Sequence, residues 1–368
     1  MKEKLLSIVL VLTMVVALAS CNSEKPIGKK DTTKSSTSAS AGGKVGVAMP
    51  TKDLQRWKQD GSYIKEQLEK AGYEVDLQFA ADDIPTQVSQ IKNMMNDGCK
   101  VLVIASIDGD SLGTVIDQAK EKSVKVIAYD RLIMNSGAVN YYITFDTYKI
   151  GVKQGEYIEE KLGLKDGNGP FNMEIFADDP SGGASKIFYN GAMEVLKKYI
   201  DSGKLVVKSG QVDFEIVGTP NNSTESAQSR MENIISANYA EASAKLDAVL
   251  CTTDSIAMGV TNALEAKYSG SVYPIITGQD CDKANVMNIL ADKQAMSVIK
   301  ITRISASKVV EMVDAIMKGG EAPVNDTESY DNGKGVVPSY LCEPVVVEKS
   351  NYKEMLIDTG YYTEDDLR

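Results

Sequence analysis

The 368-residue chain contains no histidine. Without an imidazole it cannot build a Ser-His-Asp or Cys-His catalytic centre, and it lacks the commonest side-chain ligand of transition metals. Cysteine is also scarce, with five residues and no CxxC spacing, so the sequence predicts no zinc site. Apart from Cys21, the cysteines are Cys99, Cys251, Cys281 and Cys342. Their wide separation permits disulfides outside the cell without requiring them, and their redox state stays open.

Clusters of positive charge are missing as well. The formal net charge is −11 at pH 7, and no run of lysine and arginine interrupts this acidic character. Such a chain is a poor partner for nucleic acid or for an anionic lipid surface. Neither GxGxxG nor GxxxxGK[ST] follows an early strand-like segment, so the sequence predicts no nucleotide phosphate cradle and no bound cofactor.

The amino-terminal residues form a pattern that is typical of a secretion signal. "MKEKLLSIVLVLTMVVALAS" combines an early lysine, an apolar run and small residues before Cys21. This pattern predicts a signal peptide over residues 1–20 and lipidation of Cys21 within "LASC". The alternative is an uncleaved membrane anchor, which the short apolar run disfavours because a membrane span needs about 20 apolar residues. Residues 21–43 are rich in Ser, Thr, Lys and Gly, which predicts a flexible tether outside the cytoplasm.

From Lys44 onwards, apolar runs alternate with helix-like segments in two series. The first series comprises "VGVAMP", "VDLQFA", "VLVIAS", "VKVIAYD" and "YYITFD", and the second comprises "FNMEIFA", "LVVKSG", "LDAVLCTT" and "SVYPIITG". Strands that are apolar throughout and separated by amphipathic helices are typical of parallel sheets with both faces covered. The sequence therefore predicts an α/β fold with two doubly wound lobes.

Charged side chains stand where several of these strands are expected to end. They are Arg56, Asp130, Arg131, Asp254, Asp280 and Lys300. Open parallel sheets bind ligands beyond the carboxyl ends of their strands, so these charges are candidates for one binding site. Each position also fits a solvated loop residue, and Asp254 fits a helix cap equally well. Trp57, the only tryptophan, fits either a sugar-stacking surface or an ordinary buried aromatic residue.

Carboxylates and guanidinium groups together supply the acceptors and donors that vicinal hydroxyls need, and an aromatic face suits the apolar side of a sugar ring. The charges therefore favour a sugar-binding protein. A glycosidase that uses two Asp residues as acid and base is the enzymatic alternative. Neighbouring guanidinium groups disfavour it, because they lower carboxyl pKa values and weaken a general acid. A repressor would need an N-terminal DNA-binding helix pair, whereas this chain has a signal and tether there.

Several motifs resemble those of type I periplasmic sugar-binding proteins of ABC transporters. The motifs are "RW" (56–57), "KVIAYDRLI", "GAMEVLKKYIDSGKLVVKSGQ", "TGQD", "VNDT" and "VVPSYL". They are most similar to the D-xylose-binding proteins and to the multiple-sugar-binding receptor that serves virulence sensing in plant-associated bacteria. The resemblance implies two lobes joined by a three-segment hinge. The expected lobes are residues 44–145 with 280–326, and residues 146–279 with 327–368.

The resemblance also implies which residues bind the ligand. They are Arg56, Trp57, Asp130, Arg131, Arg230, Asp254, Asp280 and, less directly, Lys300. The second lobe departs from the family pattern. Ser181, Gly183 and Ala184 stand where relatives carry an Asp and paired Asn, and Asn222 stands where relatives often carry a Trp. Lys186, with Asp178 or Asp179, is a candidate to replace the lost groups.

The function expected from the resemblance is binding of a monosaccharide and its delivery to the permease of an ABC transporter. The sequence does not decide whether the sugar is of the xylose, glucose, galactose or arabinose type. The alternative is a sugar sensor that presents its closed form to a receptor kinase or chemoreceptor. The expected protein is a monomer, with no metal and no cofactor, attached to the membrane by its lipid alone.

Overall fold

A computed structural model describes residues 42–241 and 243–368. The predicted signal peptide, the lipidation site at Cys21 and most of the predicted tether lie outside the described residues. Within the described ranges, none of the helices combines the length and the apolar character that a membrane crossing needs.

The first lobe is built on a parallel sheet with the strand order β11-β5-β4-β3-β1-β2. The strands are β1 (Lys44–Met49), β2 (Glu74–Phe79), β3 (Val101–Ile104), β4 (Lys125–Tyr129), β5 (Tyr141–Phe145) and β11 (Ser339–Cys342). Every residue of β3 is fully buried, as the continuous apolar run predicts for a central strand covered on both faces.

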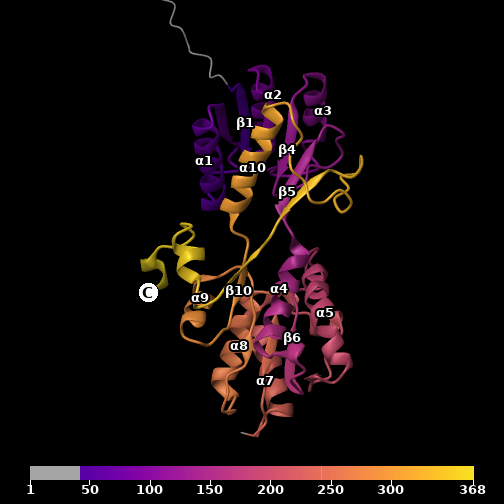
Figure 1. Ribbon diagram of the computed structural model, residues 1–368, viewed down its shortest axis with the longest axis vertical. Coiled ribbons are helices and arrows are strands. Elements are labelled where there is room, and N and C mark those ends of the chain that lie inside the picture. The colour runs from indigo at the N-terminus through magenta and orange to yellow at the C-terminus, as the bar shows by residue number, and fades with distance from the viewer. Residues whose placement is uncertain (1–41, 242) are drawn as a thin grey trace, which may run out of the picture. The chain divides into compact units, whose positions relative to one another are not determined.

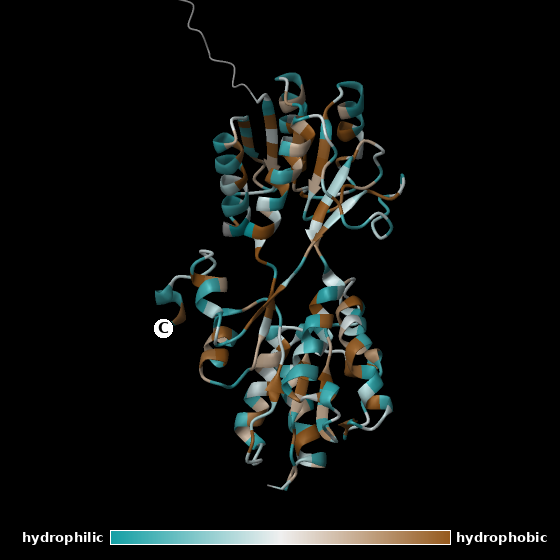
Figure 2. Cartoon of the chain, in the orientation of Figure 1, coloured by the Kyte–Doolittle hydropathy of each residue, from teal (hydrophilic) through white to brown (hydrophobic). Residues whose placement is uncertain are grey.

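Two layers of helices cover this sheet. α1 (Gln55–Lys70) and α10 (Thr302–Met317) pack on one face, and α2 (Ile84–Asn96) and α3 (Gly113–Glu121) on the other. Figure 1 shows these helices around the strands, and Figure 2 shows apolar strands inside and hydrophilic residues on the outer helix surfaces. The start of α2 is fixed locally, because Asp83 accepts a hydrogen bond from the amide of Thr86 at 2.8 Å.

The second lobe repeats the arrangement with the parallel strand order β7-β6-β8-β9. Its strands are β6 (Phe171–Phe176), β7 (Leu205–Val207), β8 (Ala248–Cys251) and β9 (Ile275–Ile276). α4 (Thr147–Lys161) and α5 (Ser185–Asp201) cover one face, and α7 (Thr224–Asn238) and α8 (Asp254–Lys267) cover the other. α4 and α5 touch backbone to backbone, since a Cβ on Gly151 would lie 1.8 Å from the carbonyl oxygen of Phe188. The predicted fold class is confirmed.

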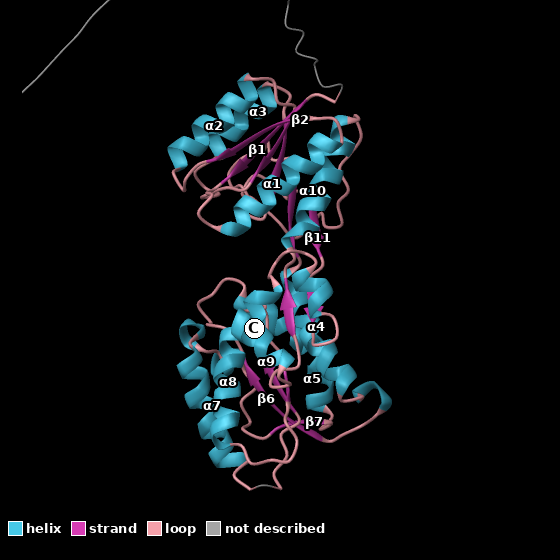
Figure 3. Cartoon of the chain, turned by 90° about the vertical axis from the view of Figure 1, so that its left-hand side faces the viewer, coloured by secondary structure: helices cyan, strands magenta, loops and turns pink. Residues whose placement is uncertain are grey.

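Smaller elements complete the second lobe. They are α6 (Phe214–Val217), α9 (Lys283–Leu290), an antiparallel pair of β10 (Ser297–Ile299) with β12 (Val345–Val347), and helical turns at Pro220–Asn222, Lys353–Ile357 and Glu364–Leu367; a further turn, Leu164–Asp166, follows α4. Figure 3 separates these helices and strands by colour. Among the described residues the four cysteines are buried and unpaired.

The chain passes between the two lobes three times: after β5, between β10 and α10, and between β11 and β12. The last two crossings differ from the boundaries expected at residues 280 and 327. Residues 280–299 stay with the second lobe, because β10 pairs with β12 and Met296 and Val298 pack against Ile150 of α4. β11 instead extends the first sheet beside β5. Strands of three or four residues are too short to reveal their partners by periodicity.

Candidate functional site

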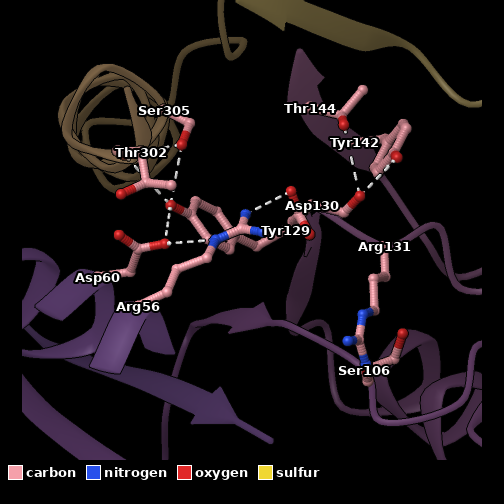
Figure 4. Close-up of polar contacts among 10 residues, drawn as sticks. All are labelled: Arg56, Asp60, Ser106, Tyr129, Asp130, Arg131, Tyr142, Thr144, Thr302 and Ser305. Atoms are coloured by element: carbon pink, nitrogen blue, oxygen red, sulfur yellow. Dashed lines mark hydrogen bonds and ion pairs between the residues drawn. The ribbon is translucent and has the colours of Figure 1, made fainter. Parts of the chain in front are cut away.

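Arg56 and Asp130 meet beyond the carboxyl ends of β1 and β4. Arg56 lies in the first turn of α1, and its Nη2 donates to Oδ1 of Asp130 at 2.5 Å. Its Nε lies 3.6 Å from Oδ2 of Asp60, one helical turn further along α1. Figure 4 shows the guanidinium between the two carboxylates. Burial opposes the charge of Arg56, but Asp130 and Asp60 outweigh burial and raise the pKa of this guanidinium.

Asp60 anchors this arrangement from inside the lobe. Its side chain is only 2% exposed, and it accepts a hydrogen bond from the hydroxyl of Tyr129 at 3.0 Å. Ser305 of α10 lies 2.9 Å from the same hydroxyl. Burial raises the pKa of Asp60, while hydrogen bonds from Thr302 and Tyr129 and the charge of Arg56 act in the opposite direction. Arg56 is therefore held in place by residues of α1, β4 and α10 before any ligand arrives.

The backbone turns sharply at Asp130, which separates the two neighbouring charges. Asp130 has a φ of 65°, and its carbonyl oxygen accepts a hydrogen bond from the hydroxyl of Tyr142 at 2.8 Å. Its side chain points toward Arg56, whereas Arg131 points away and donates to the carbonyl oxygen of Ser106 at 3.0 Å (Figure 4). Both side chains nevertheless lie at the carboxyl edge of the first sheet, where the sequence places them.

Trp57 does not present an open stacking surface in this structure. Its side chain is 2% exposed and belongs to the core between α1 and the sheet. The guanidinium carbons of Arg56 and Arg131 lie 4.5 and 5.2 Å from its ring centroid. Of the two alternatives that the sequence leaves open for Trp57, this burial favours the buried aromatic residue, and a part of Trp57 in ligand binding stays a prediction. The ring is a buried aromatic platform that supports two arginines through cation–π contact.

Asp254 is also placed differently from its predicted role as a ligand-binding residue. It is the first residue of α8, it is 1% exposed, and its carboxylate points into the lobe. It accepts hydrogen bonds from the side chains of Gln294 and Ser297 and from the amide of Asp282, each at 2.9 Å. Burial raises its pKa to about 8. In this structure Asp254 supports the loop that carries Asp280, and its contact with a ligand stays a prediction.

Three of the predicted charges line one cavity of about 400 Å³, a volume within the roughly 300–1,000 Å³ usual for small-molecule sites. The lining residues are Arg56, Gln59, Asp280, Ile299, Lys300, Thr302, Tyr361 and Tyr362. Asp280 and Lys300 are exposed, so their polar groups are available to a ligand. The cavity therefore presents cationic donors and a carboxylate acceptor within one small volume. Sequence reasoning missed both tyrosines, because no pattern places the carboxyl terminus beside the strand ends. It also missed Gln59, because an exposed residue of α1 carries no signal that sets it apart.

The other predicted residues of the second lobe lie outside that cavity lining. Arg230 is half-buried, with its guanidinium carbon 4.1 Å from the ring centroid of Phe176 and its Nε donating to Oε1 of Gln211 at 2.8 Å. Burial lowers its pKa to about 10, although Glu174 opposes this shift. Lys186 is exposed on α5, and its Nζ lies 5.9 Å from the ring centroid of Phe214.

The loop after β6 contains two carboxylates with different roles. Asp178 is 4% exposed and accepts a hydrogen bond from the hydroxyl of Thr252 at 2.5 Å, and burial raises its pKa. Asp179 holds the loop together, since it accepts hydrogen bonds from the amides of Ser181 and Asn221 at 2.8 and 2.5 Å. Asn222 accepts in turn from the amide of Asp179 at 2.6 Å. These asparagines thus shape the loop.

Comparison with known proteins gives a consistent picture. A family model described as a periplasmic binding protein domain matches residues 45–321. The multiple sugar-binding periplasmic receptor ChvE of Rhizobium radiobacter is 50% identical over 329 residues, which cover 89% of this chain and 92% of that protein. The D-xylose-binding periplasmic protein of Escherichia coli K12 is 36% identical over 326 residues, covering 88% and 92% respectively. A solved ABC transporter solute-binding protein from Clostridium phytofermentans with bound β-D-glucose is 67% identical, has a TM-score of 0.63, and is matched over 88% of this chain and 100% of its own.

Proposed function

The chain belongs to the periplasmic binding protein domain family, and we propose that it is an extracytoplasmic receptor that binds a monosaccharide between its two lobes. Like its sugar-binding relatives, it is a binding protein and not an enzyme. The observation that carries the proposal is the ion pair of Arg56 with Asp130 at the carboxyl edge of the first sheet, beside a cavity shared with Asp280 and Lys300.

This set of groups suits a sugar because it alternates donors and acceptors. A hydroxyl donates one hydrogen bond and accepts two, so adjacent hydroxyls can bridge a carboxylate and a cation at the same time. Charge-assisted hydrogen bonds of this kind are short and directional. Arg56 is already oriented by Asp60 and Asp130, so a ligand does not have to order it.

Glucose is the first ligand to test, since a 67% identical relative was solved with β-D-glucose. Xylose, galactose and arabinose are the other candidates. In the cell, the proposed receptor is a monomer anchored through lipidated Cys21, and it delivers its sugar to the permease of an ABC transporter. The alternative function is sensing, in which the sugar-bound form is presented to a receptor kinase or chemoreceptor. One relative is named a receptor, which supports testing this alternative.

The experiment is calorimetric titration of the full chain, purified in detergent, with each of the four sugars. Mannitol, an open-chain polyol, serves as the control because it offers hydroxyls without a ring. We expect saturable binding of at least one of the four sugars and none of mannitol. Absence of binding for all four sugars would refute the proposal. Uptake of labelled sugar by cells with and without the gene separates the two roles, since transport requires the receptor for uptake and sensing does not.

A further inference from the structure

The loop that carries Asp280 adopts a strained backbone. Asp280 has a φ of 97° and Cys281 a φ of 54°, so two consecutive residues with side chains occupy the left-handed region. Each such residue costs of the order of 1–3 kcal/mol and persists only when its surroundings hold it there. The contacts that hold residues 280–282 therefore decide where the Cβ of Asp280 lies, and Nε2 of Gln279 in turn donates to Oδ1 of its carboxylate at 3.0 Å.

The body of the second lobe holds the amides of this loop. The amide of Asp280 donates to the carbonyl oxygen of Val298 at 2.9 Å, and the amide of Cys281 donates to the hydroxyl of Ser297 at 3.1 Å. The amide of Asp282 donates to Oδ2 of Asp254 at 2.9 Å. All three donors are thus satisfied by β10 and by the buried carboxyl group of Asp254 at the start of α8.

The end of the chain holds the carbonyl groups of the same loop. The hydroxyl of Tyr362 donates to the carbonyl oxygen of Cys281 at 3.0 Å, and the hydroxyl of Tyr361 donates to that of Asp280 at a longer 3.4 Å. The two rings meet edge to face with centroids 4.9 Å apart. Burial, reinforced by the charge of Asp282, raises the pKa of Tyr362 to about 12, so its hydroxyl remains a donor at physiological pH.

Apolar packing fixes this carboxyl-terminal turn against the loop. Cys281 belongs to a buried cluster with Ile299, Val347 and Leu356, and the ring of Tyr362 packs on the same cluster. Tyr361 also lines the cavity together with Asp280 and Lys300. The turn is therefore part of the wall of the candidate site and is connected to the loop by both apolar and polar contacts.

We propose that Tyr361 and Tyr362 are positioning residues of the sugar site, whose hydroxyls hold residues 280–282 in the conformation that directs the Asp280 carboxylate into the cavity. This inference rests on the proposed function, and it assigns to the last residues of the chain a part in recognising the hydroxyls of the ligand. The tyrosines act through the loop backbone, and Asp280 makes the contact.

The first experiment removes only the hydroxyls. The double variant Tyr361→Phe/Tyr362→Phe keeps both rings, and Tyr352→Phe is the matched control. Tyr352 packs on the same cluster, and its hydroxyl makes no hydrogen bond to another of the described residues. Because two neutral hydrogen bonds are lost, we expect glucose to bind the double variant roughly fivefold to thirtyfold more weakly, and the control within about twofold of wild type. Wild-type affinity in the double variant would overturn the inference.

A second experiment asks whether the tyrosines act through Asp280. In an Asp280→Ala background, the same double Phe change is expected to weaken glucose binding by less than about twofold, since the group it positions is already gone. A full, additive loss would show that the tyrosines act by general stabilisation and would overturn the positioning role.

A third measurement does not depend on the ligand. Hydrogen–deuterium exchange of the 280–282 amides in the sugar-free protein is expected to be faster in the double Phe variant and unchanged in Tyr352→Phe. Unchanged exchange in the double variant would overturn the inference whether or not the wild type binds sugar. Failure of the wild type to bind any of the four sugars would instead overturn the proposed function.

Discussion

Replacing Asp130 by Asn tests the ion pair on which the proposed function depends. Asn has the same shape but carries no charge, so it weakens the 2.5 Å contact with Arg56 without leaving a cavity. The side chains of Arg56 and Asp130 are 40% and 22% exposed, and partly exposed ion pairs contribute about 0–1 kcal/mol to folding. Arg56 also keeps Asp60 as a partner, so we expect the free energy of unfolding to change by less than about 1 kcal/mol.

Binding should suffer much more than folding. The ligand displaces water from around Arg56 and Asp130, so the loss of one of the two charged partners of Arg56 in such a place costs about 2–4 kcal/mol of binding, although Asp60 remains. This range corresponds to a loss of affinity of roughly thirtyfold to a thousandfold. The assay pairs calorimetric titration with the best sugar and urea unfolding of the same preparation.

Asp97→Asn is the matched control for this variant. Asp97 is exposed in the same lobe, and it follows α2 just before the start of β3, so it lies at the opposite edge of the sheet from Asp130. The charge change is the same, and we expect both affinity and stability to remain at wild-type values. If Asp130→Asn binds like wild type, or loses binding only in proportion to unfolding, the charges at the strand ends belong to the scaffold and the reasoning is wrong.

Three other measurements test separate parts of the account. Cys21→Ser is expected to move the chain from the membrane to the soluble fraction, and an equally membrane-bound variant would contradict the lipid anchor. Incubation with glycosides or free sugars is expected to give no product, and a product whose formation requires Asp280 would contradict a pure binding role. Burial raises the pKa of Asp254 from its ordinary 3.8 to about 8, so between these values the unfolded chain ionises while the folded chain stays protonated. Stability should therefore fall as pH rises, by up to about 1.4 kcal/mol per pH unit from this group, and Asp254→Asn should flatten that fall between pH 5 and 7. Equal slopes for the two proteins would refute the assignment.

The sequence predicts the edges of the sheets well because two simple rules decide them. Continuous apolar runs must be buried on both faces, and parallel strands bring their carboxyl ends to one edge. These rules place Asp130 and Arg131 beside the loop that follows β1, and the ion pair with Arg56 agrees with that placement. The lobe boundaries were harder to predict, since β10, β11 and β12 have only three or four residues each and their partners come from distant parts of the chain.

The sequence pattern does not predict how deeply a side chain is buried or in which direction it points. Asp254 and Asp280 both follow a strand of the second lobe, yet Asp254 is 1% exposed whereas Asp280 is exposed. The difference arises because α8 begins at Asp254 and turns its first side chain inward, toward the donors of Gln294 and Ser297. Trp57 is buried for a similar reason, since it lies on the face of α1 that packs against the sheet.

In both halves of the candidate site, protein contacts hold the charged side chain in place before a ligand arrives. In the first lobe, Arg56 is fixed by Asp60 and Asp130, and in the second lobe Asp280 is fixed by a strained loop whose backbone groups are all held. Neither half has to order its side chains when a ligand arrives, so little conformational entropy is lost within either lobe. A ligand shifts a conformational equilibrium only by its difference in affinity for the two states. In the proposed function, contacts made to both preformed halves at once supply that difference, and a sugar that reached only Arg56 and Asp130 would bind without closing the protein.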